Sequence, residues 1–173
     1  MNNFEPQPVL ARMDLSNRIF FKLYQCANML HKTGSRAVET EGLTTQQWAV
    51  LGALSRPQAK DGMGVGELAH YLMVSRQNLS EMINRMASAG HVRIGPGRID
   101  RRSRRITMTA SGAKLWRQRA LPKIHAYYDQ ALEGFSMHDL THTLHYLLRM
   151  LENMQHIEAA AQDDCAACKD SAG

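Results

Sequence analysis

The sequence predicts a mainly α-helical protein with one small β-hairpin. Three observations lead to this class. Apolar residues recur at helical spacing along most of the 173 residues. Alternating apolar and polar residues occur in two short runs, which lie on either side of a Gly-Pro-Gly break at residues 95–97. With 44% hydrophobic residues, a chain of this length can form the core of a single domain.

A long first helix is expected to begin at Asp14 or Ser16 and to continue to about Glu41, where Gly42 ends it. Residues 1–13, which include two prolines, are expected to form a flexible arm. The helix carries one broad apolar face, made of Leu15, Ile19, Leu23, Cys26, Ala27 and Leu30. A face of this width indicates packing against another helix.

A second helix is expected after Thr44 or Thr45, either of which can cap it, and Pro57 stops it. Its core residues are Trp48, Val50, Leu51 and Leu54. A polar loop follows over residues 56–64, with a one-residue strand expected at Met63.

Two short amphipathic helices come next, separated by only Met73 and Val74. The apolar side of the first consists of Val65, Leu68, Ala69 and Leu72. Ser75 is a good N-cap for the second, because its hydroxyl can accept a hydrogen bond from an unpaired amide, and no Pro or Gly follows until Gly90. So tight a connection is typical of a helix-turn-helix motif, although two helices of a small bundle would give a similar pattern.

The second helix of this pair has a buried stripe and a polar outer face. The stripe, at the spacing of one helical face, is Leu79, Met82, Ile83 and Met86. The outer face is Arg76, Gln77, Ser80, Glu81, Asn84 and Arg85. Gln, Asn, Ser and Arg are side chains that hydrogen-bond to base edges in a major groove. We therefore interpret this segment as a DNA-recognition helix.

A basic hairpin follows the recognition helix. Strands are expected from His91 to Ile94 and from Ile106 to Thr109. Residues 93–105 carry six Arg and one Asp, a net charge of +5, which equals the net charge of the whole chain. A positive field concentrated beside a recognition helix suits a wing that contacts phosphates and reaches a minor groove, whereas the alternative is a solvated basic loop.

The helix-turn-helix and the hairpin together resemble the winged helix-turn-helix core of the MarR family of bacterial transcriptional regulators. The residues that carry the resemblance are Leu68-Ala69, Ser75-Arg76, Gly90-His91-Val92, Asp100-Arg101-Arg102 and Met108-Thr109-Ala110-Ser111-Gly112. The intervals between Gly90, Asp100 and Thr109 match as well, and a weaker resemblance extends over residues 15–155. The resemblance implies an obligate homodimer on a pseudo-palindromic operator, usually a repressor released by a small ligand.

The resemblance also assigns roles to particular residues. Arg102 corresponds to the wing arginine that enters the minor groove, and Asp100 to the acid that orients it. Departures from the family pattern are Ile94 and Gly95, where arginines are common, and Glu81, where a basic residue is common. First-turn contacts correspond to Arg76, Asn78 and Ser80. The full candidate DNA-binding set is Ser75, Arg76, Gln77, Asn78, Ser80, Arg85, Arg98, Asp100, Arg101, Arg102 and Arg104.

Two further helices are expected after the wing. Residues 110 to about 132 are expected to be helical with an irregularity at Pro122, and a last helix runs from Met137 to about Ala161. The last helix has nearly coiled-coil spacing of Leu140, Leu144, Leu147, Leu148, Leu151 and Met154. It is therefore expected to dimerise together with the first helix, so that two recognition helices face one duplex, rather than to pack within one subunit.

The predicted organisation is one domain at residues 14–161, followed by a disordered tail at 162–173. Within the domain, residues 14–42 and 110–161 are expected to dimerise and residues 44–109 to form the DNA-binding lobe.

Effector binding is expected between these parts, because family pockets lie there and often accept aromatic acids or phenolic compounds. The candidate residues are Arg18, Tyr24, His31 and Trp48. They supply a guanidinium for a carboxylate, rings for stacking and a polar atom for a phenol. The predicted effector is an aromatic carboxylate or its coenzyme A thioester, and no cofactor is expected.

Three alternatives stay open. Oxidation sensing would use Cys26, which is instead expected to be a buried small hydrophobe. Metal sensing would use the helical face formed by His138, His142 and His145, or the CxxC pair Cys165 and Cys168. These two groups are expected to be solvated histidines and part of the disordered tail. A ligand-independent architectural DNA-binding protein is the third alternative.

Other classes are disfavoured by the sequence. It has no Ser/His/Asp arrangement, phosphate-binding glycine loop or HExxH motif, so an enzyme is not expected. It has no membrane-length apolar run, and residues 1–14 lack the apolar core of a secretory signal. Three Cys, an odd number, indicate reduced thiols. A cytoplasmic protein that does not bind membranes is expected, and its pI near 9.3 suits a nucleic-acid partner.

Overall fold

The computed structural model describes residues 8–96 and 104–170, and the side chains of residues 10–96 and 104–161. The chain divides into two compact units, residues 1–129 and 130–173, each of which is described by itself. The elements of the first unit, in chain order, are α1 Pro8–Ala37, η1 Glu39–Glu41, α2 Thr45–Leu54, η2 Pro57–Ala59, β1 Met63–Gly64, α3 Val65–Leu72, α4 Arg76–Ser88, β2 Val92–Pro96, β3 Arg104–Met108, α5 Ala110–Leu115, η3 Trp116–Ala120 and most of α6 Leu121–Ala131. The second unit is formed by α7 Met137–Asp170.

The β-strands form one antiparallel sheet of order β1-β3-β2. Strands β2 and β3 make the expected hairpin, in which Ile94 pairs with Ile106. The short strand expected at Met63 is present, and Met63 pairs with Ile106 from the other side. Ile106 is fully buried, so the sheet joins the core at its middle strand.

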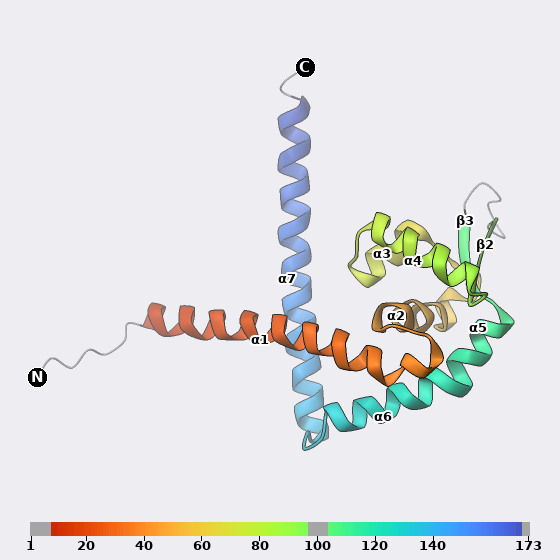
Figure 1. Ribbon diagram of the computed structural model, residues 1–173. Helices are drawn as coiled ribbons and strands as arrows, with labels where there is room; N and C mark the ends of the chain where they lie inside the picture. The colour runs from red at the N-terminus through yellow and green to blue at the C-terminus, as the bar shows by residue number, and fades with distance from the viewer. Residues whose placement is uncertain (1–7, 97–103, 171–173) are drawn as a thin grey trace, which may run out of the picture. The chain divides into compact units, whose positions relative to one another are not determined.

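Helix α2 lies between α1 and the α3–α4 pair and contacts both (Figure 1). The fully buried large side chains come from α2, α3, α4, β3, α6 and the position just after α1: Val38, Val50, Leu51, Leu68, Leu79, Ile83, Met86, Ile106 and Ile124. The four residues predicted to form the inner stripe of the recognition helix, which is α4, are all buried. Burial of one stripe fixes which face of α4 points outward.

The helical segment after the wing is irregular, as expected near Pro122. Residues 116–120 form a π-helix, in which the amide of Leu121 donates to the carbonyl of Trp116. Pro122 has no amide hydrogen, so the regular hydrogen bond to Gln118 cannot form. The local widening buries Trp116 and Ala120 against the core.

Three helix boundaries differ from the prediction. Helix α1 begins at Pro8 rather than at Asp14 or Ser16, because a proline at the first helical position lacks only an amide that would have no helical partner. It ends at Ala37, and Gly42, at φ 68°, closes η1 instead. Helix α7 continues to Asp170 rather than to about Ala161, through an alanine-rich segment that favours helix.

Helix α7 has a well-formed start. The Asp139 carboxylate accepts from the Ser136 amide at 2.9 Å and from its hydroxyl at 2.6 Å, while the Asp139 amide donates to the Ser136 hydroxyl. These hydrogen bonds hold the pKa of Asp139 below its usual value.

In the described parts of the chain, no helix combines the length and apolar character needed to cross a bilayer.

Candidate nucleic-acid interface

The turn between α3 and α4 is held by a paired set of backbone hydrogen bonds. Met73 adopts the left-handed conformation at φ 53°. Its amide donates to the carbonyl of His70, and the amide of Val74 donates to the carbonyl of Ala69. This is a Schellman motif, in which one residue in the left-handed conformation ends the helix. The turn between α3 and α4 is therefore held by backbone hydrogen bonds.

Helix α4 starts at the predicted cap. The Ser75 hydroxyl accepts from the Asn78 amide at 3.3 Å. The side chains expected to read DNA from this helix are exposed: Arg76, Gln77, Asn78 and Arg85. Ser80 is half-buried and donates its hydroxyl hydrogen to the Arg76 carbonyl at 2.7 Å, so a contact from Ser80 would use the oxygen as an acceptor.

Arg76 lies against the first turn of α3. A Cβ placed at Gly66 would come within 3.3 Å of the Arg76 guanidinium. Glycine at this position therefore leaves room for Arg76 to rest over the α3 backbone, next to the exposed face of α4.

Glu67 connects α3 to the base of the wing. Its carboxylate accepts from the Gly64 amide at 3.1 Å, which caps α3, and pairs with Arg105 of β3 at 2.6 Å. Gly64 and Arg105 are also partners in the β1–β3 ladder. One carboxylate thus links the start of α3 to the strand that leads out of the wing.

Thr109 and Gly112 join the other end of the wing to α5. The Thr109 hydroxyl donates to the Gly90 carbonyl at 2.6 Å and accepts from the Gly112 amide at 2.9 Å, which caps α5. A Cβ at Gly112 would lie only 2.0 Å from the His91 carbonyl oxygen. Only glycine allows this close approach, which gives a physical reason for the Thr-Ala-Ser-Gly sequence.

The described part of the wing is basic. Arg93 and Arg104 are exposed and Arg105 is half-buried. The other predicted wing residues, Arg98, Asp100, Arg101 and Arg102, lie outside the described residues. Both strands of the hairpin therefore bring arginine side chains to the surface beside α4.

Trp48 of α2 forms an aromatic cluster with Tyr127 and Tyr128 of α6. The Trp48 ring meets the edges of Tyr127 and Tyr128 of α6, with ring centroids 6.0 Å apart in each case. The Tyr127 hydroxyl hydrogen-bonds Thr33 of α1 at 2.9 Å. Burial first, and Tyr127 second, raise the pKa of Tyr128 above its usual value, so its phenol keeps its proton at neutral pH.

The four predicted effector residues are not brought together within one chain. Trp48 is buried and touches α1 at Gly34, where an added Cβ would lie 3.0 Å from the Trp48 ring. Arg18 lies sixteen residues before Gly34, which is about 24 Å along a helix. It is exposed, with its guanidinium 4.0 Å from Asp14. Tyr24 is also exposed, and His31, one turn from Gly34, is the nearest of the three to Trp48.

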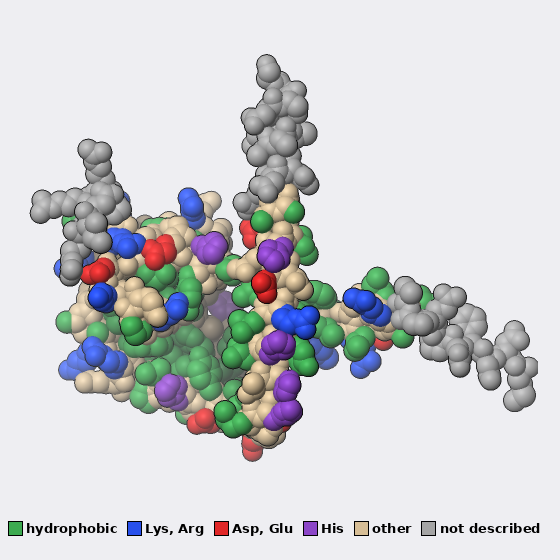
Figure 2. All heavy atoms as spheres, turned by 180° about the vertical axis from the view of Figure 1, so that it is seen from behind, with side chains coloured by type: hydrophobic (Ala, Val, Ile, Leu, Met, Phe, Trp, Pro, Cys, Tyr) green, Lys and Arg blue, Asp and Glu red, His purple; other side chains and the backbone are tan. Residues whose placement is uncertain are grey.

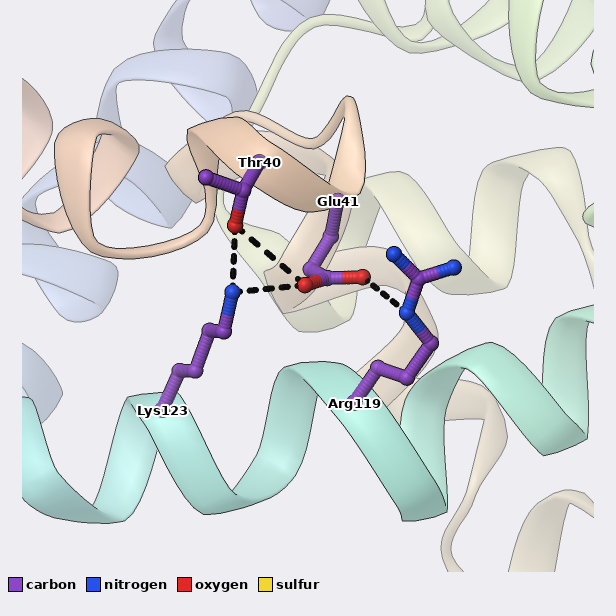
Figure 3. A network of polar contacts seen from close by, with 4 residues as sticks. All are labelled: Thr40, Glu41, Arg119 and Lys123. Carbon is purple, nitrogen blue, oxygen red and sulfur yellow. Dashed lines mark hydrogen bonds and ion pairs between the residues drawn. The ribbon is translucent and has the colours of Figure 1, made fainter.

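A buried carboxylate, Glu41 of η1, pairs with Lys123 of α6 and Arg119 of η3 (Figure 3). Glu41 has a side chain only 3% exposed, and its two oxygens lie 2.6 Å from Lys123 Nζ and 2.6 Å from Arg119 Nε. Lys123 also donates to the Thr40 hydroxyl. The hydrogen bond from Lys123 is the main cause that holds the pKa of Glu41 below its usual value, in spite of burial. Lys123 lies one turn from Tyr127, so the network anchors the aromatic cluster.

Comparisons with known proteins agree with this geometry. A model of the MarR family matches residues 41–103, which span α2, the helix-turn-helix and β2. The transcriptional activatory protein BadR of Rhodopseudomonas palustris is 62% identical over 157 residues, which cover 91% of this chain and 90% of BadR. The chain belongs to the MarR family. Its function as a transcriptional regulator follows from this membership.

Solved structures of MarR regulators share the fold. CouR of Rhodococcus jostii RHA1, bound to p-coumaroyl-CoA, superposes with a TM-score of 0.70 at 22% identity, covering 79% of this chain and 93% of CouR. MosR of M. tuberculosis, in complex with DNA, superposes with a TM-score of 0.63 at 24% identity, covering 78% of this chain and 96% of MosR. The predicted fold class, a winged helix-turn-helix with long flanking helices, is confirmed.

The residues considered for metal or oxidation sensing are placed as follows. Cys26 is exposed on α1, so its expected burial is wrong for a single chain. His138 and His142 stack edge to face, with ring centroids 4.2 Å apart. Among the described residues, His, Cys, Asp and Glu form no group of three or more that could hold a metal ion. The side chains of Cys165 and Cys168 lie outside the described residues.

Sequence reasoning missed the tyrosines of α6. Residues 110–132 were interpreted only as a dimerisation helix, although Tyr127 and Tyr128 form an aromatic pair in a chain with 6% aromatic residues. The Tyr127–Tyr128 pair was the available sequence signal for an aromatic cluster. Its partner on α2, Trp48, is distant in sequence.

Proposed function

We propose that this MarR-family regulator binds a pseudo-palindromic duplex operator as a homodimer and responds to an aromatic carboxylate or its coenzyme A thioester. The observation that carries the DNA part is the outer face of α4. It places Arg76, Gln77 and Asn78 in the first exposed turn, beside exposed arginines of both wing strands. Major-groove reading by a helix and phosphate contacts by a wing use these residue types. The MosR structure, which contains DNA, supports the same mode for this chain.

Homodimerisation is supported by the apolar surfaces of the two terminal helices, each considered alone. Helix α1 exposes large apolar side chains: Leu10, Met13, Leu15, Ile19, Phe20, Phe21, Met29 and Leu30. Helix α7 exposes Leu144, Leu147, Leu148, Leu151, Met154 and Ile157. Hydrophobic side chains along both helices are visible in Figure 2. Continuous apolar surfaces of this kind mark protein interfaces, and a second copy of the chain offers the same surfaces in return.

The effector is proposed to bind against the cluster of Trp48, Tyr127 and Tyr128. Aromatic edges on α2 and α6 suit a flat aromatic ring, and Tyr128 is 41% exposed with a protonated phenol that can donate to a carbonyl or carboxylate. Arg18 lies too far along α1 to reach this cluster in its own chain, so its proposed role requires the partner's copy. CouR, whose structure contains p-coumaroyl-CoA, supports this effector class.

Activation is proposed as the sign of regulation. The family resemblance alone implied a repressor, but the 62% identical relative is named an activatory protein. At this identity the regulatory sign is expected to be shared. Transcription by purified RNA polymerase from the operator-bearing promoter should therefore rise when the protein is added, whereas a fall would show repression.

The first experiment uses fluorescence anisotropy to measure how tightly the purified protein binds two labelled duplexes. One is DNA from upstream of the protein's own gene, and the other is a scrambled sequence. A regulator is expected to prefer its operator by roughly a thousandfold or more. Each binding reaction is repeated with benzoate, p-coumarate, p-coumaroyl-CoA, zinc and peroxide. A change of affinity with the aryl compounds alone supports the proposed effector, a change with zinc or peroxide supports the sensing alternatives, and equal affinity for both duplexes supports an architectural protein.

Variants locate the effector. Tyr128→Phe removes one hydroxyl donor and should weaken the response to p-coumaroyl-CoA by about 2- to 10-fold. Tyr146→Phe, an exposed tyrosine on α7, is the matched control and should respond as the wild type does. Arg18→Ala with an unchanged response would remove Arg18 from the site.

A further inference from the structure

A separate cavity lies between the end of α2, η2, β1 and α3. Its volume is about 240 Å³, and its floor is formed by Ala53, Ala59 and Met63, each at most 7% exposed. Its polar walls are Arg56, Gln58, Glu67, His70 and Tyr71. The cavity is distinct from the Trp48 cluster, because Trp48 and Ala53 point to sides of α2 that differ by about 140°.

The floor and walls differ in chemistry. The floor offers only methyl and thioether groups, which suit an apolar ring. On the wall, the guanidinium of Arg56 stands over the Tyr71 ring, with its central carbon 4.6 Å from the ring centroid. A ring attracts the cation but accepts no conventional hydrogen bond, so the donors of Arg56 stay available to a ligand.

The charge balance of the walls favours an anion. The carboxylate of Glu67 is compensated by Arg105 at 2.6 Å and by the Gly64 amide at 3.1 Å. Within the described parts of the chain, the positive charge of Arg56 lies over the aromatic face of Tyr71. A planar guanidinium is well suited to bind a carboxylate through two parallel hydrogen bonds.

The size of the cavity limits the ligand. Drug-sized ligands occupy pockets of about 300–1,000 Å³. A cavity of about 240 Å³ is below that range, which suits a molecule with a single ring. A coenzyme A thioester is far larger than this volume, so the cavity could hold no more than part of it.

We propose that this cavity binds a small aromatic carboxylate, with its ring on the Ala53–Ala59–Met63 floor and its carboxylate on Arg56. Only the link between this cavity and regulation rests on the proposed function, because binding of the carboxylate to the cavity requires no DNA. An occupant would lie next to Glu67, whose ion pair with Arg105 holds the base of the wing. The cavity is thus a second small-molecule site within the DNA-binding lobe.

The test uses the full chain with 13C-labelled methyl groups on Ala and Met and 15N-labelled Trp, titrated with 4-fluorobenzoate and followed by NMR. The methyl resonances of Ala53, Ala59 and Met63 should shift together along one saturable curve. Arg56→Gln should weaken this binding about tenfold or more, because it removes a charged hydrogen-bond partner. Arg56→Lys, which keeps the charge, should restore part of the affinity.

Two controls separate this site from other effects. Arg36→Gln, an exposed arginine in the last turn of α1, should leave the titration unchanged. 4-Fluorobenzamide, which keeps the ring and lacks the charge, should bind more weakly than the carboxylate. Shifts confined to the Trp48 indole would overturn the second site and support the proposed effector site. Pocket shifts that are equal for the amide and insensitive to Arg56→Gln would overturn the carboxylate assignment.

Discussion

Gly112 tests whether the contact between α5 and the wing is as close as the structure shows. An alanine Cβ at this position would lie 2.0 Å from the His91 carbonyl oxygen, whereas ordinary contacts begin at 3.4 Å. The carbonyl would have to move by about 1.4 Å, and it also accepts from the Thr109 amide at 3.1 Å. Overpacking of this kind costs about 1–3 kcal/mol, and the size of the clash places Gly112→Ala near the upper end, at about 3 kcal/mol.

Gly52 provides a matched control with the same chemical change. An alanine Cβ there would lie 3.5 Å from the Trp116 ring, which is ordinary contact. Because Gly52 is inside α2, Gly52→Ala should stabilise the protein by about 0.5–1 kcal/mol through helix propensity. Urea unfolding at one fixed protein concentration measures both variants. If Gly112→Ala stays within about 0.5 kcal/mol of the wild type, the reasoning on this contact is refuted.

Three further predictions concern the wing, the recognition helix and the buried carboxylate. Arg102→Ala should weaken operator binding and lower the slope of log affinity against log salt by about one, and an unchanged slope in anisotropy titrations would remove the minor-groove assignment. Ser75→Ala should cost about 1 kcal/mol in urea unfolding, because the Asn78 amide loses its cap, whereas Ser75→Asp should keep that stability. Because the pKa of Glu41 is lowered from 4.5, its ion pairs stabilise the fold above that pH and less as pH falls through the lowered folded pKa. Urea unfolding from pH 7 to pH 3 should therefore show a flatter acid decline in Glu41→Gln, and identical declines would contradict the assignment.

Local patterns allowed most of the fold to be predicted. The buried stripe of α4 is a repeat within thirteen residues, and the wing strands alternate apolar and polar residues at 92–94 and 106–108, so their faces follow from short-range periodicity. The Ser75 cap and the break near Pro122 are likewise effects of single residues on the adjacent backbone. These features require no knowledge of distant partners.

The aromatic cluster could not be predicted in the same way. Thr33 and Tyr127 meet across 94 residues of sequence. Trp48 contacts Tyr127 of α6, a helix that follows a π-helix and is held by ion pairs to Glu41. Arg18 shows the converse case, since its charge suits a carboxylate but it lies about 24 Å along α1 from Gly34, where Trp48 packs. Its role in effector binding therefore stays a prediction that requires the partner's copy. The chemical type of a side chain can be read from the sequence. Which side chains lie close together depends on the tertiary structure.

The position of β3 as the middle strand has a consequence for hydrogen exchange. Its amides face partners on two sides, β1 and β2, whereas one edge of β2 has no neighbouring strand in the described sheet. Ile106 is fully buried at the crossing of both ladders. Its amide should exchange only through opening of the lobe as a whole, at a rate that reports global stability, while the outer amides of β2 exchange through local fraying. The wing is thus expected to be built on one of the slowest-exchanging points of the domain, which would give the arginines proposed to contact DNA a fixed base.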